Sequence, residues 1–259
     1  MSTNSNISEA LALLKEAIVY VDQARPQGME TIDPVQFRPK KMYLQLYSLC
    51  EAVRILLESQ FTDAAATVLR TAMWDTHRLL YLNQNPELRG SLILSLEIEF
   101  QSDRRRLLQV AKRLGKDVTG MQEKIDERDR AIEESRIARG IDKIRRFPRD
   151  GDSIARAVGR EADILGHKMF SISAHGGSKS PLMDMTRSDK GDIGLYAKSS
   201  NQNVICGLAL LASDFLFVAT IAVAEMWGWP NLDELQREHR KIAAQFEKII
   251  TVRERADLQ

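Results

Sequence analysis

The apolar segment from Val204 to Ala224 constrains the fold more than any other part of this sequence. It is nearly as long and as apolar as a membrane-spanning helix, and Trp227 and Trp229 follow it where interfacial aromatic residues would lie. Asp214 stands in its middle, however, and a carboxylate in a bilayer core costs roughly 2.5 to 3.5 kcal/mol. We therefore expect a buried helix inside a bundle rather than a membrane span, and we expect no membrane partner.

The rest of the chain also carries apolar residues at helical spacing, interrupted by Pro, Gly and polar residues. A chain of 259 residues with 44% hydrophobic residues is long enough to build one substantial core. The sequence therefore predicts an all-α protein, a multi-helix bundle of about eight helices in a single domain, residues 1–259. The expected helices cover about residues 7–24, 40–59, 62–82, 86–113, a stretch after the turn at 114–117, then 152–175, 204–224 and 231–255.

Two stretches differ from this apolar pattern. Residues 101–150 are rich in Arg, Lys, Glu and Asp, with sparse apolar positions, which predicts a charged helical hairpin inserted into the bundle. Basic residues crowd the end of this stretch, but acids that precede them can pair with them at i to i+4, so we interpret the run as a solvated face rather than a phosphate site. Residues 176–203 are rich in Gly, Ser, Asp and Lys, and a segment of this length between helices is a candidate lid loop.

Composition argues against several classes of site. The formal net charge of +1 leaves no overall field to attract nucleic acid or an anionic membrane, so any basic site must be local. Cys50 and Cys206 lie far apart within apolar helical patterns, and the four histidines show no metal-ligand spacing. We therefore expect reduced thiols, no metal site and no cofactor. The N-terminus lacks the pattern of a signal peptide, so we expect a cytoplasmic protein.

One stretch, residues 154–177, concentrates chemically useful side chains. If it forms one helix, Arg160, His167, Ser171 and His175 fall on a narrow stripe opposite an apolar face. Ser171 and His175 are spaced i to i+4, so the imidazole can reach the hydroxyl, but one helix supplies neither a strained nucleophile elbow nor oxyanion donors. We expect a polar site here and not a serine hydrolase.

A second polar set lies on the helix expected at 62–82. Arg70 and His77 are seven residues apart and therefore nearly superimposed in projection, beside an apolar stripe. A half-buried arginine needs an anion or several acceptors, and Asp214 on its apolar helix has the same need with the opposite sign. We expect either that Arg70 pairs with Asp214 or that one of them faces a polar cavity shared with His175. A purely structural ion pair is the alternative.

The spacing Arg70-x6-His77 recurs as Arg160-x6-His167, and it resembles the Arg-x(4 to 6)-His motif of HEPN ribonucleases. That resemblance implies an all-helical homodimer in which paired Arg and His side chains cut RNA. A ribonuclease or toxin acting in phage defence is therefore one alternative, with RNA as a candidate partner and a dimer as the expected oligomer.

Two blocks of sequence together resemble the bacterial family known as domain of unknown function 5677. The block AAATVLRTAMWDTHRLLYL is similar to a family helix with a small-small-x-Leu-Arg pattern, and it places Arg70 on the family arginine. The block HKMFSISAHGG is similar to an aromatic-x-x-Ser-x-x-x-His-Gly helix, and it places Ser171 and His175 on the family serine and histidine. The resemblance spans about residues 40–227 and implies an α-helical bundle with a polar site between these two helices and no established activity.

At the position of the family glutamate this chain has Trp74, followed by Asp75. We hypothesise that the protein binds a small anionic or nucleotide ligand at a site formed by Arg70, Asp75, Ser171, His175 and Asp214. The ribonuclease is one alternative and an interaction scaffold without any site is the other. The sequence therefore leaves open whether the protein is an enzyme.

Overall fold

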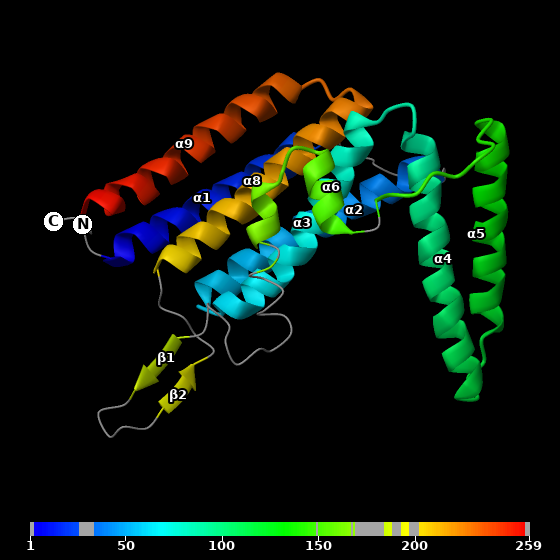
Figure 1. The fold of residues 1–259 in the computed structure, drawn as a ribbon, viewed down its shortest axis with the longest axis horizontal. Helices are drawn as coiled ribbons and strands as arrows, with labels where there is room; N and C mark the ends of the chain where they lie inside the picture. The colour runs from blue at the N-terminus through cyan, green and yellow to red at the C-terminus, as the bar shows by residue number, and fades with distance from the viewer. Residues whose placement is uncertain are drawn as a thin grey trace.

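The computed structural model describes the backbone of residues 3–25, 34–148, 150–166, 168, 184–187, 193–196 and 202–256. Within these residues the chain is almost entirely helical, which confirms the all-α fold class (Figure 1). The helices are α1 (Thr3–Ala24), α2 (Pro34–Glu58), α3 (Thr62–Gln84), α4 (Arg89–Arg113), α5 (Thr119–Ala138), α6 (Gly151–Ala157), α8 (Gln202–Trp227) and α9 (Leu232–Ala256). Two short strands, β1 (Asp184–Arg187) and β2 (Ile193–Tyr196), pair as an antiparallel ribbon inside the segment expected to be a loop.

Helix α8 occupies the centre of the bundle, with α1, α2, α3 and α9 packed around it (Figure 1). Among the described helices, its stretch Val204–Trp227 alone has the length and apolarity of a membrane span, with a mean hydropathy of 2.3, yet 61% of an 18-residue apolar window within it is buried inside the protein. Ala209 and Ala212 are fully or almost fully buried and let neighbouring helices approach closely, while Phe215 fills space between them. The most apolar segment is therefore the core helix that the sequence predicts.

Helices α2 and α3 pack on one side of α8 and make the most extensive helix pair of the bundle. The chain reverses between them at Gln60, which adopts a left-handed backbone with a φ of 62°. Helix α3 begins at Thr62, as expected, but α2 begins at Pro34 and runs through Pro39, where the sequence predicted a loop. Pro39 lies near the N-terminus of α2, where a proline removes only one backbone hydrogen bond, so the helix tolerates it.

Helices α4 and α5 form the charged hairpin, which extends away from α1, α8 and α9 (Figure 1). Only Ile125 and Ile132 of α5 are buried. The hairpin is tied to α2 through the buried carboxylate of Glu97, which accepts a hydrogen bond from Arg38 at 2.5 Å and another from Arg128 at 3.0 Å. The helical pair begins at Arg89, before the change in composition at residue 101.

The stretch expected as one helix, residues 152–175, is broken. Helix α6 ends at Ala157, Gly159 adopts a left-handed backbone with a φ of 72°, and a new helical turn covers residues 162–166. Arg160 lies in the break and not within a continuous helix, because a glycine in this conformation ends a helix. His167 and residues 169–183, which include Ser171 and His175, lie outside the described residues, as does most of the candidate lid loop.

Candidate functional site

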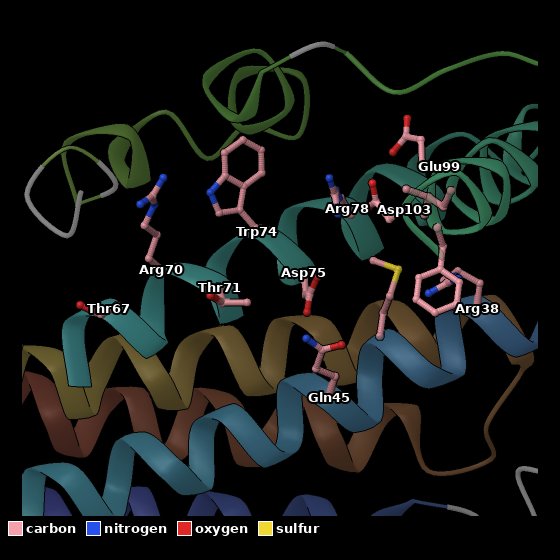
Figure 2. Close-up of a pocket in the computed structure, with 13 residues that line it drawn as sticks. Arg38, Gln45, Thr67, Arg70, Thr71, Trp74, Asp75, Arg78, Glu99 and Asp103 are labelled. Atoms are coloured by element: carbon pink, nitrogen blue, oxygen red, sulfur yellow. The ribbon is translucent and has the colours of Figure 1, made fainter. Parts of the chain in front are cut away.

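A cavity of about 550 Å³ lies where α2, α3 and α4 meet (Figure 2). One face of α3 supplies much of its lining, because residues spaced three and four apart share a helical face. We call this space the α3 cavity, and its volume is typical of small-molecule sites. The lining residues from α3 are Thr67, Arg70, Thr71, Trp74, Asp75 and Arg78.

Asp75 is the buried acid of the α3 cavity. Its side chain projects from α3 toward Gln45 of α2 (Figure 2), and the residue is 8% exposed. Its Oδ2 atom has no hydrogen-bond partner among the described residues. Burial raises the pKa of Asp75 to about 6, against the opposing pull of the Arg78 and Arg38 charges. The cavity thus holds a carboxyl group with an oxygen that the described part of the chain leaves unsatisfied.

Two arginines of α3 flank this acid along the helix. Arg70 is half-buried and has no hydrogen bond or ion pair among the described residues. The guanidinium of Arg78 lies 5.9 Å from the Trp74 ring, and its buried Nε atom has no described acceptor. In Figure 2 the side chains of Arg70 and Trp74 leave α3 on the same side. The cavity therefore offers guanidinium donors that its own walls do not use.

The α4 end of the cavity is formed by an aromatic ring among cations. Phe100 lies 4.3 Å from the guanidinium carbon of Arg38, 4.9 Å from Nζ of Lys41 and 5.8 Å from the guanidinium carbon of Arg104. The acids Glu99 and Asp103 also line this end. Charges of both signs therefore meet at the α4 end of the cavity.

A neighbouring face of α3 contributes to a different polar cluster. His77 is buried and its Nε2 donates to Oδ2 of Asp163 at 2.7 Å, and Nε of Arg160 donates to the same oxygen at 2.8 Å. Nη2 of Arg160 also donates to Oδ2 of Asp214 at 2.5 Å. His239 of α9 donates from Nε2 to the other oxygen of Asp214 at 3.1 Å.

We call these five residues the ion network, and it joins α3, residues 160–163, α8 and α9. Two phenylalanines of α8 support it, since Phe215 lies under the Arg160 guanidinium at 5.6 Å and Phe217 stacks on the His239 ring at 5.3 Å. Burial acts to raise the pKa of Asp163 and of Asp214. Hydrogen bonds and charges from their histidine and arginine partners outweigh burial, so both pKa values lie below the ordinary aspartate value. Each carboxylate is therefore held ionised by its partners.

Trp74 separates the α3 cavity from the ion network. It lines the cavity on one side, and on the other side it borders a void of about 10 Å³ beside His77 and Asp163. The six-membered ring of Trp74 packs on Gly151 so closely that an added Cβ would lie 2.0 Å from a ring carbon. Glycine at the first position of α6 thus allows the helix to rest directly on the indole.

The structure places the predicted site residues in separate groups. Arg70 and Asp75 line the α3 cavity. The expected pair of Arg70 with Asp214 is wrong, because Asp214 pairs with Arg160 and His239. Arg70 and His77 also fall into different groups, since Arg70 lines the cavity and His77 contacts Asp163.

Sequence reasoning missed several residues of both groups. Asp163 stands three residues after Arg160, a spacing that favours an ion pair on one helical turn. The expectation of a continuous helix selected His167 instead. Arg38 and His239 come from distant helices, and only packing brings them to these sites. Among the described residues, no group of three or more His, Cys, Asp or Glu side chains could hold a metal ion.

Comparison with known proteins gives one family. The family model described as "Family of unknown function (DUF5677)" matches residues 39–192, which contain all of α3 and every residue of the cavity lining except Arg38. The match confirms the resemblance drawn from the two sequence blocks, and it ends before α8. No curated protein and no solved structure matches the chain.

Proposed function

We propose a ligand-binding function for this chain, which belongs to DUF5677, a family of unknown function. In this proposal the α3 cavity binds a small ligand that carries an anionic group. The observation that carries the proposal is Arg70, a half-buried guanidinium on the cavity wall with no partner among the described residues. A guanidinium is satisfied best by a carboxylate or a phosphate, which accept two of its hydrogen bonds at once. An anionic group on the ligand would supply the hydrogen-bond acceptors that Arg70 lacks among the described residues.

Asp75 narrows the chemistry of the ligand. A buried carboxyl oxygen without a hydrogen-bond partner is costly, and a donor on the ligand removes that cost. The ligand therefore combines an anionic group for Arg70 with an N–H or O–H donor for Asp75. A nucleoside monophosphate has both features, and a cavity of about 550 Å³ is large enough for one.

The unsatisfied polar groups of the α3 cavity distinguish this proposal from the alternative of an interaction scaffold without a site. A scaffold would satisfy its buried polar groups internally, as the ion network does. Within the described residues the α3 cavity does the reverse, because Asp75 Oδ2 and Arg78 Nε have no partners. This contrast favours a ligand site over a purely structural role for Arg70.

Calorimetric titration tests the proposal with adenosine 5′-monophosphate, inorganic phosphate and adenosine as probes. We expect the monophosphate to bind more tightly than either fragment, and Arg70→Gln to weaken it about tenfold or more, because a hydrogen bond to a charged group is lost. Arg54→Gln is the matched control, since Arg54 pairs with Glu51 and Glu58 on α2 away from the cavity lining. Equal affinities of the wild type and Arg70→Gln, or no binding of any probe, would overturn the proposal.

The ribonuclease alternative has its own test in cells that express the protein. RNA loss that disappears in His77→Ala or His167→Ala would replace the ligand-binding proposal with RNA cleavage. We expect RNA to stay intact in all strains, because His77 is hydrogen-bonded to Asp163 and does not form an Arg–His pair with Arg70.

A further inference from the structure

The free end of the charged hairpin concentrates positive charge. Residues 104–116, RRRLLQVAKRLGK, hold six basic residues and no acid, although the whole chain has a formal net charge of only +1. We call residues 104–116 the hairpin end. It comprises the second half of α4 and the turn that follows, where Gly115 has a φ of 68°.

Most of this charge is not neutralised by the residues that the structure describes. Arg105 pairs with Asp129 of α5, and Arg106 lies 3.4 Å from Asp103. The other four bases, Arg104, Lys112, Arg113 and Lys116, have no ion-pair partner among the described residues. Lys112 and Arg113 lie in the last turn of α4, where they also complement the negative end of the helix dipole. That effect explains the position of Lys112 and Arg113 but not the exposed apolar residues of the hairpin end.

Large apolar side chains are exposed among these bases. Leu107 is 65% exposed, Val110 51% and Leu114 69%. Their spacing of three and seven residues places them on one stripe of α4. Leu108, in contrast, is 4% exposed and belongs to the buried side of α4. The exposed stripe is thus an apolar face that the described part of the chain does not cover.

The hairpin end is also accessible to a broad surface. Figure 1 shows the α4–α5 turn at the far end of the hairpin, away from the body formed by α1, α8 and α9. Met121, at the start of α5, is 41% exposed at the same end. The exposed stripe therefore continues to the end of the hairpin that is remote from α1, α8 and α9.

We propose that the hairpin end docks on an anionic lipid bilayer, with Leu107, Val110 and Leu114 in the interface and the unpaired bases on the lipid headgroups. A basic helix with an exposed aliphatic stripe has the chemistry of a helix that lies in the membrane interface. A second copy of the chain fits less well, because pairing two hairpin ends would bring two sets of six bases together. A nucleic acid would attract the bases but would leave the aliphatic stripe facing water and phosphates.

Co-sedimentation of the full chain with vesicles tests this docking. We expect the protein to bind vesicles of phosphatidylcholine mixed with phosphatidylserine and not vesicles of phosphatidylcholine alone, because the bases attract the negative charge of the phosphatidylserine headgroups. Leu107→Glu and Leu114→Glu should each weaken the binding about tenfold or more. Lys112→Gln combined with Arg113→Gln should weaken it on the order of tenfold or more, and salt should weaken wild-type binding.

Matched controls separate docking from general effects. Ile137→Glu changes a 63% exposed apolar residue at the opposite end of α5 and should leave vesicle binding unchanged. Arg237→Gln combined with Arg240→Gln removes two exposed charges from α9 and should also leave it unchanged. Wild-type protein that stays in the supernatant, binds both vesicle types equally, or binds as well with Leu107→Glu would overturn the proposal. A dimer in sedimentation velocity that Leu107→Glu dissociates, or RNA binding that it abolishes, would overturn it in favour of that other partner.

Discussion

The ion network and the α3 cavity use the same residue types and share helix α3, but they satisfy their charges in opposite ways. In the network each carboxylate accepts hydrogen bonds from an arginine and a histidine, and Arg160 serves two acids at once. In the cavity neither Oδ2 of Asp75 nor the Arg70 guanidinium has a partner among the residues that the structure describes. The network thus joins helices through satisfied charges, whereas the unsatisfied groups of the cavity are the basis of the proposal that it binds a ligand.

This difference appears in how the two regions respond to pH. Asp163 and Asp214 have lowered pKa values in the folded chain, so they stabilise it above the unfolded pKa, near 4, and this stability is lost as the pH falls below that value. Asp75 has its pKa raised to about 6, so the folded chain holds a proton there that the unfolded chain releases near pH 4. Stability from Asp75 therefore falls as the pH rises from about 4 to about 6.

The largest effect is expected when the network loses its shared cation. Arg160→Ala leaves Asp163 and Asp214 largely buried without the guanidinium that joins them, and it should lower the free energy of unfolding by about 3 kcal/mol. Urea unfolding followed by circular dichroism measures this. Arg106→Ala, which removes an exposed ion pair on α4, is the control and should change stability by less than about 1 kcal/mol. Equal losses in the two variants would show that the network has no special structural role.

Replacing aspartate by asparagine should change the free energy of unfolding in opposite directions in the two regions. Asp75→Asn removes the carboxylate that burial opposes, so above about pH 6 it should stabilise the protein by up to about 3 kcal/mol, with no gain below about pH 4. Asp214→Asn removes a carboxylate that Arg160 and His239 favour, so it should destabilise the protein at neutral pH. Urea titrations at both pH values measure the two changes, and the same sign for both variants would contradict the contrast between the regions.

The boundary between the regions can be disturbed at Gly151. An alanine there would put its Cβ 2.0 Å from the Trp74 ring, so the indole or α6 must move, at a cost of about 2 kcal/mol. Urea unfolding measures the loss, and tryptophan fluorescence reports the displaced ring. Gly207→Ala on α8 is the matched control, because no atom lies within 4 Å of its added Cβ, and it should stabilise the helix by about 0.5 to 1 kcal/mol. A Gly151→Ala protein with unchanged fluorescence and stability would show that Trp74 is not held by α6.

The smallest effect on stability is expected at Arg70. Because Arg70 has no described partner in the folded chain, Arg70→Gln should change the free energy of unfolding by no more than about 0.5 kcal/mol. Urea unfolding without added ligand measures this. A loss comparable to that of Arg160→Ala would mean that Arg70 is structural, and it would remove the contrast between the two arginines.

Local pattern predicted much of the fold. The periodicity of apolar residues predicted α3, α8 and α9 to within a few residues, and the lone carboxylate of Asp214 correctly indicated that α8 needs a polar partner. The break at Gly159 was not foreseen, because a glycine inside an apolar helical pattern is compatible both with a continuing helix and with a left-handed stop. That one ambiguity led to the expectation of a continuous helix through Arg160, which instead lies in the break.

The site was predictable only where its residues lie on one helix. Arg70 and Asp75 belong to one face of α3, so helical spacing and the family pattern were enough to select them. The partner of Asp214 was not predictable, because Arg160 is 54 residues away in the chain and Arg70 had the same charge and an equally suitable helix. Choosing between them requires the packing of α6 against α3, which no local pattern contains.

The position of α8 in the chain bears on how the protein is synthesised. A ribosome makes α1, α2 and α3 before it makes the most apolar segment, and all three pack against α8 in the folded chain. Arg160 is also made before Asp214, so the carboxylate meets an available cation soon after it emerges. Because N-terminal parts of a chain generally fold first, α1, α2 and α3 can cover α8 as it leaves the ribosome. This order shortens the time during which the apolar surface of α8 is exposed and can aggregate.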